Sequence, residues 1–128
     1  MRSFLNLTKA LADETRLRIL MALRGGELCI CQMTSLLGMA PSTVSRHLSL
    51  LDQAGLIEKQ KCGKWAYCRL AGSTAPAPVK KALALVRESL AGTGPIARDA
   101  ERLTTIKSLS LEDICLPLND KRKRRARR

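Results

Sequence analysis

Apolar residues recur every three or four positions through the first half of the chain, and glycines interrupt the pattern. This spacing is typical of helices that bury one face. Glycine and Asp13 mark the expected boundaries, because glycine ends helices and aspartate caps their N-termini. The pattern predicts four helices, over residues 4–12, 13–24, 29–37 and 42–53.

The periodicity changes in the second half of the chain. Two alternating stretches flank a Cys-Gly-Lys turn, and together they predict a β-hairpin. A linker rich in Gly, Ser, Thr and Pro follows, and helical spacing then returns in two stretches that Gly92, Gly94 and Pro95 separate. The expected elements are strands at 56–61 and 65–70, a linker at 72–78, and helices at 79–91 and 96–108.

The order of these elements indicates the fold. Three helices, a tight turn, a fourth helix and a hairpin follow the order of a winged helix-turn-helix, in which the third helix braces the fourth. The expected fold class is therefore mainly α with a β-hairpin wing (α+β). We expect a winged helix-turn-helix domain over residues 1–95 and a C-terminal extension over 96–128, in which the basic tail at 121–128 is disordered because its like charges repel.

Positive charge is concentrated at the C-terminal end. The net charge is +12, and seven of the 23 Lys and Arg residues lie in the last eight positions, KRKRRARR, so the rest of the chain carries +5. A net positive charge favours a polyanionic partner, above all nucleic acid. The alternative for KRKRRARR is a solvated tail that binds nothing. No apolar run reaches the roughly 18 residues of a membrane span, and the N-terminus is too charged for a secretory signal. We therefore expect a cytoplasmic protein with no membrane partner.

The fourth predicted helix carries short polar and basic side chains opposite its apolar stripe. Hydroxyl groups suit phosphate oxygens and base edges, and Arg46 can form two hydrogen bonds with a guanine. The hairpin adds lysines near its tip, as a contact with the DNA backbone or minor groove requires. An ordinary solvated surface is the alternative for both sets. The expected DNA-binding residues are Ser42, Thr43, Ser45, Arg46, His47, Ser49, Lys59, Lys61 and Lys64.

The five cysteines suggest no disulfide framework, and in a reducing cytosol they are expected to be reduced thiols, metal ligands or small core residues. Cys29 and Cys31 stand at the start of the third predicted helix. Side chains two residues apart diverge on a helix but share one side of an extended segment, so both thiols can easily bind one ion only where the backbone departs from a regular helix. Two buried helix residues are the alternative. We expect Cys68 in the core and Cys62 exposed at the turn.

Four segments resemble the ArsR/SmtB family of metalloregulatory repressors in order and spacing: LADETRLRIL, ELCICQM, PSTVSRHLSLLDQAGLI and GKWAYCRL. The resemblance covers roughly residues 4–92 and is strongest to the arsenic-responsive type. It implies a homodimer, joined through its first and last helices, that binds a palindromic operator at the nucleoid of the bacterial cytosol. Such a dimer releases its operator when a metal ion or arsenite binds. The fourth helix then resembles the recognition helix, and ELCICQM resembles the arsenic- or cadmium/lead-binding box.

Two departures from the family pattern concern the ligands. The arsenic-type box has a third cysteine where this chain has Thr34, and residues 76–92 offer only Glu88 for the zinc site of other members. Thiolates select soft ions, so we expect arsenite, As(III), as inducer, with Sb(III), Cd(II) or Pb(II) as alternatives and no organic cofactor. Trivalent arsenic takes three thiolates, and Cys115 is the leading candidate for the third; its alternative role is an apolar anchor for the tail. The expected ligand set is Cys29, Cys31 and Cys115.

These features together predict a repressor that releases its operator when a thiophilic ion binds Cys29 and Cys31. In the unliganded dimer, residues 29–37 are expected to be helical and to hold the two thiols apart. The alternatives are a redox-sensing repressor of the same fold, in which cysteine oxidation causes release, and a basic RNA-associated protein, which the near lack of aromatic side chains disfavours. An enzyme is not expected, because the sequence offers no nucleophile–base pair and no phosphate loop.

Overall fold

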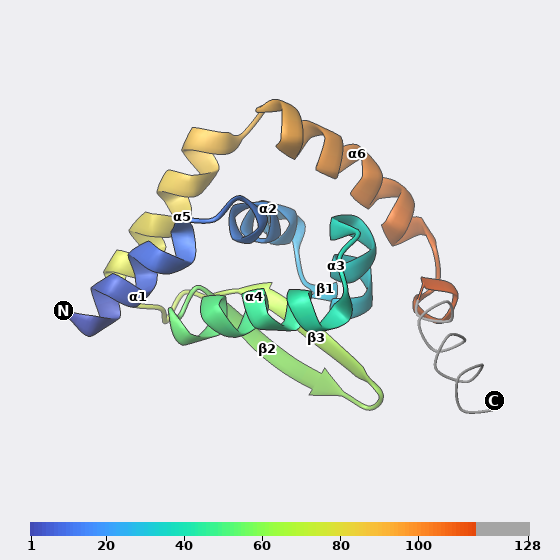
Figure 1. The fold of residues 1–128 in the computed structure, drawn as a ribbon, viewed down its shortest axis with the longest axis horizontal. Coiled ribbons are helices and arrows are strands. Elements are labelled where there is room, and N and C mark those ends of the chain that lie inside the picture. The colour runs from blue at the N-terminus through green and yellow to red at the C-terminus, as the bar shows by residue number, and fades with distance from the viewer. Residues whose placement is uncertain (115–128) are drawn as a thin grey trace.

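The structure, a computed structural model, describes residues 1–114. The remaining stretch, 115–128, lies outside the described residues, and with it Cys115 and the basic tail at 121–128. No helix in the described part is long and apolar enough to cross a membrane. The elements follow one another in this order (Figure 1): α1 (Arg2–Leu11), α2 (Glu14–Ala22), the 3₁₀ turn η1 (Leu23–Gly25), β1 (Leu28–Cys29), α3 (Ile30–Leu37), α4 (Pro41–Gln53), β2 (Ile57–Cys62), β3 (Trp65–Leu70), α5 (Ala77–Leu90) and α6 (Gly94–Ser108).

The helix boundaries follow local sequence signals. Asp13 caps α2, because its Oδ2 accepts a hydrogen bond from the backbone N–H of Arg16 at 3.0 Å. Gly38 ends α3 in the left-handed conformation, with φ 64°, which glycine adopts without a steric penalty. Pro41 occupies the first turn of α4, where its missing N–H removes no helical hydrogen bond. The four helices predicted in the first half are confirmed, with one change at the start of α3.

The sheet has one strand more than the sequence predicts. β2 and β3 form the expected antiparallel hairpin, and β1 pairs with the other edge of β3, which gives the order β1-β3-β2. The expectation that residues 29–37 are all helical is wrong at its first residue. Cys29 is extended, with φ −68° and ψ 147°, and stands opposite Tyr67 in the sheet. A strand of two residues shows no alternation that a sequence pattern could reveal.

The core is aliphatic and gathers side chains from most elements of the described chain. The few aromatic residues stay outside it, since Phe4 is exposed and Trp65 and Tyr67 are half-buried. Leucine, isoleucine, valine and methionine therefore supply most of the apolar area that stabilises the fold. The largest side chains buried almost completely are Ile19, Leu23, Leu28, Cys29, Met33, Leu36, Val44, Leu48, Leu51, Leu56 and Cys68.

Helices α5 and α6 meet at an angle and together form an arch over α2 (Figure 1). Both begin two residues before their predicted starts, because a proline in the first turn is well suited to a helix N-terminus. Helix α6 packs on α2 and α3 and buries Ile96, Leu103 and Ile106 in the same core cluster as those helices. A further helical turn over 111–114 ends with Ile114 buried. The first part of the predicted C-terminal extension is thus packed against the winged-helix core.

Candidate functional site

Helix α4 has one buried apolar face and one exposed polar face. Val44, Leu48 and Leu51 are buried and fix the helix to the core. Because these three recur at helical spacing, the residues between them turn outward. The predicted DNA-binding side chains of α4 lie on that outer side: Ser42, Thr43, Ser45 and Arg46 are exposed, and His47 and Ser49 are half-buried.

An open groove of about 470 Å³ runs along the N-terminal half of α4. It offers hydroxyl groups, an imidazole and two guanidinium groups, which are the donors that a polyanion requires. One of its residues, Arg16 of α2, is not among the predicted site residues, because nothing in its local sequence distinguishes it from a solvated helix position. The groove is lined by Arg16, Ser42, Thr43, Arg46, His47 and Leu50.

His47 rests against the N-terminal end of α2, and its side chain is 17% exposed. Its Nδ1 lies 3.2 Å from Nη1 of Arg16 and 3.8 Å from Oδ2 of Asp13. The Arg16 side chain also donates to the carbonyl oxygens of Lys9 and Ala10, at 2.9 and 2.8 Å, where α1 ends. His47 is therefore part of the groove wall and is also tied to α1 through Arg16.

The lysines of the hairpin keep their charge at the surface. Lys61 is exposed, and Lys59 Nζ lies 3.9 Å from a carboxylate oxygen of α4. Lys64 Nζ lies 5.0 Å from the centre of the Trp65 ring and 3.7 Å from Oε1 of Glu112. Ion pairs this exposed are weak. All three lysines thus remain accessible to a polyanion, on the hairpin that follows α4.

The Cys29–Cys31 pair lies where the backbone changes from extended to helical. Cys29 is 1% exposed, and its N–H donates to Oε1 of Gln32 at 2.8 Å as α3 begins. Cys31 lies in the first turn of α3 and is half-buried. Because the helix starts between the two residues, the divergence of side chains on a regular helix does not apply to this pair.

The other described cysteines match their predicted environments. Cys68 is buried on β3, and burial raises the pKa of its thiol to about 11, so the thiol stays protonated at neutral pH. Cys62 is exposed at the end of β2. Within residues 1–114, no three His, Cys, Asp or Glu side chains gather in a way that could hold a metal ion. The predicted third ligand, Cys115, lies outside the described residues.

Comparison with known proteins identifies relatives among bacterial regulators. Residues 13–59 match the family described as bacterial regulatory protein, arsR family. The arsenical resistance operon repressor of Escherichia coli (strain K12) is 46% identical over 67 residues, which is 52% of this chain and 57% of that protein. The cadmium resistance transcriptional regulatory protein CadC homolog of Staphylococcus aureus is 37% identical over 81 residues, which is 62% of this chain and 67% of that protein.

The fold comparison agrees. The homodimeric winged helix-turn-helix DNA-binding domain of Mb0332 from Mycobacterium bovis superposes with a TM-score of 0.59 at 33% identity, over 69% of this chain and 78% of that one. The winged helix-turn-helix prediction is therefore confirmed, and the relatives are regulators, not enzymes. The chain spans about half the length of the arsenical resistance repressors that it matches. By these matches it belongs to the ArsR family of bacterial regulatory proteins.

Proposed function

We propose that this protein is a homodimeric transcriptional repressor that binds operator DNA and releases it when arsenite binds Cys29, Cys31 and a third thiolate. The observation that carries the proposal is the position of Cys29 and Cys31. They stand on either side of the first residue of α3, and α3 packs directly on α4, the helix with the exposed polar face. A ligand at the thiols thus acts one helix away from the DNA-binding surface.

For DNA, the expected contacts follow from the exposed side chains. Helix α4 enters the major groove, where Arg46 can donate two hydrogen bonds to a guanine and the hydroxyls of Ser42, Thr43 and Ser45 reach phosphates or base edges. The hairpin lies over the adjacent backbone, and Lys59, Lys61 and Lys64 neutralise phosphates. Ser49 and His47 stand closer to the core and complete the contact surface.

A homodimer accounts for apolar side chains that the monomer leaves in solvent. Phe4 and Leu5 on α1 are 63% and 47% exposed, and Leu85 on α5 is 61% exposed. Exposed apolar side chains of this size indicate an interaction surface when they form one patch. A dimer through α1 and α5 sets two α4 helices for half-sites about 34–36 Å apart. The Mycobacterium bovis relative is described as homodimeric.

The inducer site takes its third thiolate from Cys115 in this proposal. Ile114, the preceding residue, is buried in the core cluster, and Glu112 lies beside Lys64 of the hairpin, so the chain beyond α6 returns to the body of the domain. Three thiolates suit As(III), and the names of the relatives include both arsenical and cadmium resistance regulators. We take As(III) as inducer and Sb(III), Cd(II) and Pb(II) as competitors.

Release follows from the geometry at the start of α3. An ion that draws the sulfurs of Cys29 and Cys31 together has to move Cys29, which is held by its pairing with β3 and by Gln32. The start of α3 then shifts, and α4 shifts with it, so the two recognition helices lose the spacing of the operator. Couplings of this kind are typically about 1–3 kcal/mol, or roughly 5–150-fold in affinity.

The experiment starts from DNA that the protein itself selects. A randomised duplex pool, enriched by repeated capture on the protein, should converge on a two-fold symmetric site. Arsenite added under reducing conditions should lower the affinity for that site, and Cys29→Ser/Cys31→Ser should abolish the response while Cys62→Ser, an exposed cysteine, should leave it intact. Cys115→Ser should reduce the number of arsenite-protected thiols from three to two.

Two outcomes contradict the proposal in different places. If the duplex pool never converges on a sequence, the proposed operator-binding function is contradicted. A Cys29→Ser/Cys31→Ser variant that still releases DNA normally with arsenite removes the inducer site and leaves DNA binding in place. Release by peroxide in the absence of any metal ion would assign the same thiols to redox sensing instead.

A further inference from the structure

Arg16 stands where α1, α2 and α4 meet. Its Nε donates to the carbonyl oxygen of Ala10 at 2.8 Å, and its Nη2 donates to that of Lys9 at 2.9 Å. Both carbonyls lie in the last turn of α1, where a positive charge is favourable, and that of Lys9 also accepts from the backbone N–H of Ala12 at 3.2 Å. The third contact is with His47 of α4, between Nη1 and Nδ1 at 3.2 Å. One side chain therefore connects the end of α1 to the helix of the proposed DNA interface.

The contact with Arg16 determines which nitrogen of His47 carries the proton. A guanidinium group keeps all its protons at physiological pH and has no acceptor, so Nη1 donates and Nδ1 accepts. A ring nitrogen that accepts a hydrogen bond is unprotonated. The neutral imidazole then carries its proton on Nε2, as the tautomer with an Nε2–H donor.

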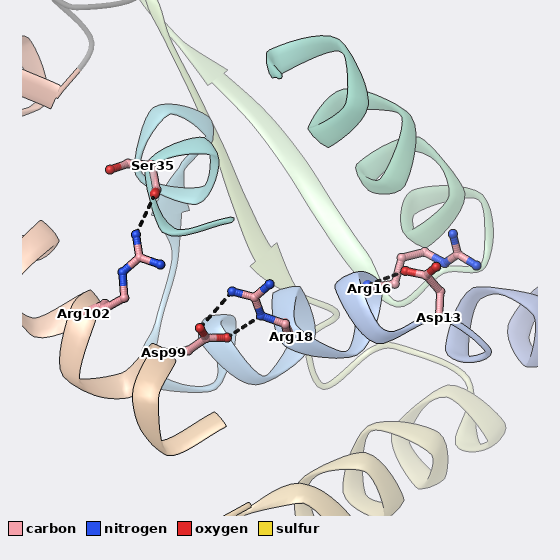
Figure 2. Close-up of polar contacts among 6 residues, drawn as sticks. All are labelled: Asp13, Arg16, Arg18, Ser35, Asp99 and Arg102. Carbon is pink, nitrogen blue, oxygen red and sulfur yellow. Dashed lines mark hydrogen bonds and ion pairs between the residues drawn. The ribbon is translucent and has the colours of Figure 1, made fainter. Parts of the chain in front are cut away.

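Asp13 is the competing partner for the same ring nitrogen. Its Oδ2 lies 3.8 Å from Nδ1, which is too far for a hydrogen bond, and the same oxygen already accepts from the backbone N–H of Arg16 at 3.0 Å (Figure 2). A proton on Nδ1 would point into the region of the Arg16 guanidinium. The shorter contact therefore decides the tautomer.

We propose that Arg16 is a positioning residue of the DNA-binding face, which holds His47 as the Nε2–H tautomer so that the ring donates to a phosphate oxygen of duplex DNA in the groove. Nε2 makes no hydrogen bond with any of residues 1–114, and the His47 side chain lines the groove beside Arg46 and Thr43. Since Arg16 is anchored at the end of α1, the same network sets the position of α4 relative to α1. This inference rests on the proposed DNA-binding function.

The first test needs no DNA. The chain has a single histidine, so the two imidazole nitrogens can be observed in a nitrogen–proton correlation spectrum without assignment among residues. At a pH where the ring is neutral, the wild-type protein should show a protonated Nε2 and an unprotonated Nδ1. A protonated Nδ1, or an even mixture of tautomers, overturns the proposal even if every variant fails to fold.

The second test uses Arg16→Met, which keeps an unbranched apolar stem and removes the donors of the side chain. It should release the ring into a mixture of tautomers and weaken binding to the selected duplex by about tenfold, the effect of one lost hydrogen bond to a charged group. Arg24→Met removes the same charge from an exposed position on η1, away from the groove, and should change the affinity far less.

A purely electrostatic role for Arg16 would give a different pattern. In that case the effect of Arg16→Met would fade as salt rises from about 50 mM to about 200 mM, and it would remain in a His47→Phe background. For a positioning role, the loss persists across that range and disappears in a His47→Phe background, because Arg16 then has no ring to orient. An undiminished effect of Arg16→Met in that background contradicts the proposal. A wild-type protein that selects no duplex would instead contradict the proposed function and leave the tautomer result unaffected.

Discussion

Arg16 and Arg18 lie two residues apart on α2, and their side chains leave opposite sides of the helix. Arg16 reaches α1 and α4, on the side of the proposed DNA interface, whereas Arg18 reaches α6. Figure 2 shows Arg18 with Asp99 near the centre of the view and Arg16 with Asp13 to their right. The same residue type in the same helix thus serves two different interfaces.

The acceptors explain what each arginine does. Arg18 forms two hydrogen bonds with the carboxylate of Asp99, at 2.8 and 2.9 Å, and Asp99 is 7% exposed. The hydrogen bonds that Arg18 donates to Asp99 also raise the pKa of Arg18 above its usual value. Arg16 bonds to two backbone oxygens and to a ring nitrogen of His47, none of which carries a negative charge. We infer that Arg18 governs the stability of the fold, and Arg16 the alignment of α4.

The largest effect should come from Arg18→Met. This substitution leaves the Asp99 carboxylate buried without its partner, which should lower the free energy of unfolding by about 3 kcal/mol. Urea denaturation measures the loss. The affinity of the remaining folded protein for its selected duplex should change by less than about twofold, or about 0.4 kcal/mol. Arg18 contacts α6 and not the proposed DNA interface.

The double variant Arg18→Met/Asp99→Leu separates charge from packing. Two apolar side chains of similar size should restore most of the stability, since a buried ion pair is often no more stable than an apolar replacement. If Arg18→Met leaves the unfolding free energy unchanged but weakens DNA binding tenfold, the assignment of the two faces of α2 is the wrong way round.

The second effect in size concerns Asp13, on the Arg16 side. Asp13→Ala removes the cap of α2 and should lower the free energy of unfolding by about 1 kcal/mol. Asp13→Asn is the matched control, because asparagine caps helices as well as aspartate does but carries no charge. Thermal unfolding should show a midpoint temperature for Asp13→Asn close to that of the wild type, and a lower one for Asp13→Ala. If Asp13→Asn and Asp13→Ala lose the same stability, the negative charge of Asp13 near His47, and not its capping hydrogen bond, stabilises the Arg16 side of α2.

The sequence predicts those features of the fold that depend on neighbours along the chain. Asp13 as a cap, Gly38 as a helix end and the change of period at the hairpin are all local signals, and the structure confirms each of them. The buried stripe of α4 follows from helical spacing alone, so the sequence also predicts which face of the helix is exposed.

The features that the sequence does not predict depend on distant partners. Asp99 lies 81 residues from Arg18, and His47 lies 31 residues from Arg16, so no spacing rule connects them. Strand β1 is two residues long and exists only because an edge of β3 accepts it. This edge places Cys29 outside the predicted helix, so the two cysteines stand on either side of its first residue. The DNA contacts and the ligand roles of the cysteines stay predictions.

The smallest effect should come from Arg102, which extends the α6 side of the comparison to the thiol-bearing helix. Its Nη2 donates to the carbonyl oxygen of Ser35 in α3 at 3.3 Å, a long and exposed hydrogen bond (Figure 2). Arg102→Met should therefore lower the free energy of unfolding by about 0.5 kcal/mol or less, at the bottom of the range for such bonds. Arg98→Met, exposed one turn earlier on α6, removes the same charge and serves as the control. A loss of stability in urea as large as that of Arg18→Met would mean that α6 contributes as much to holding α3 as it does to holding α2. Movement of α3 on arsenite binding would then have to displace α6 as well.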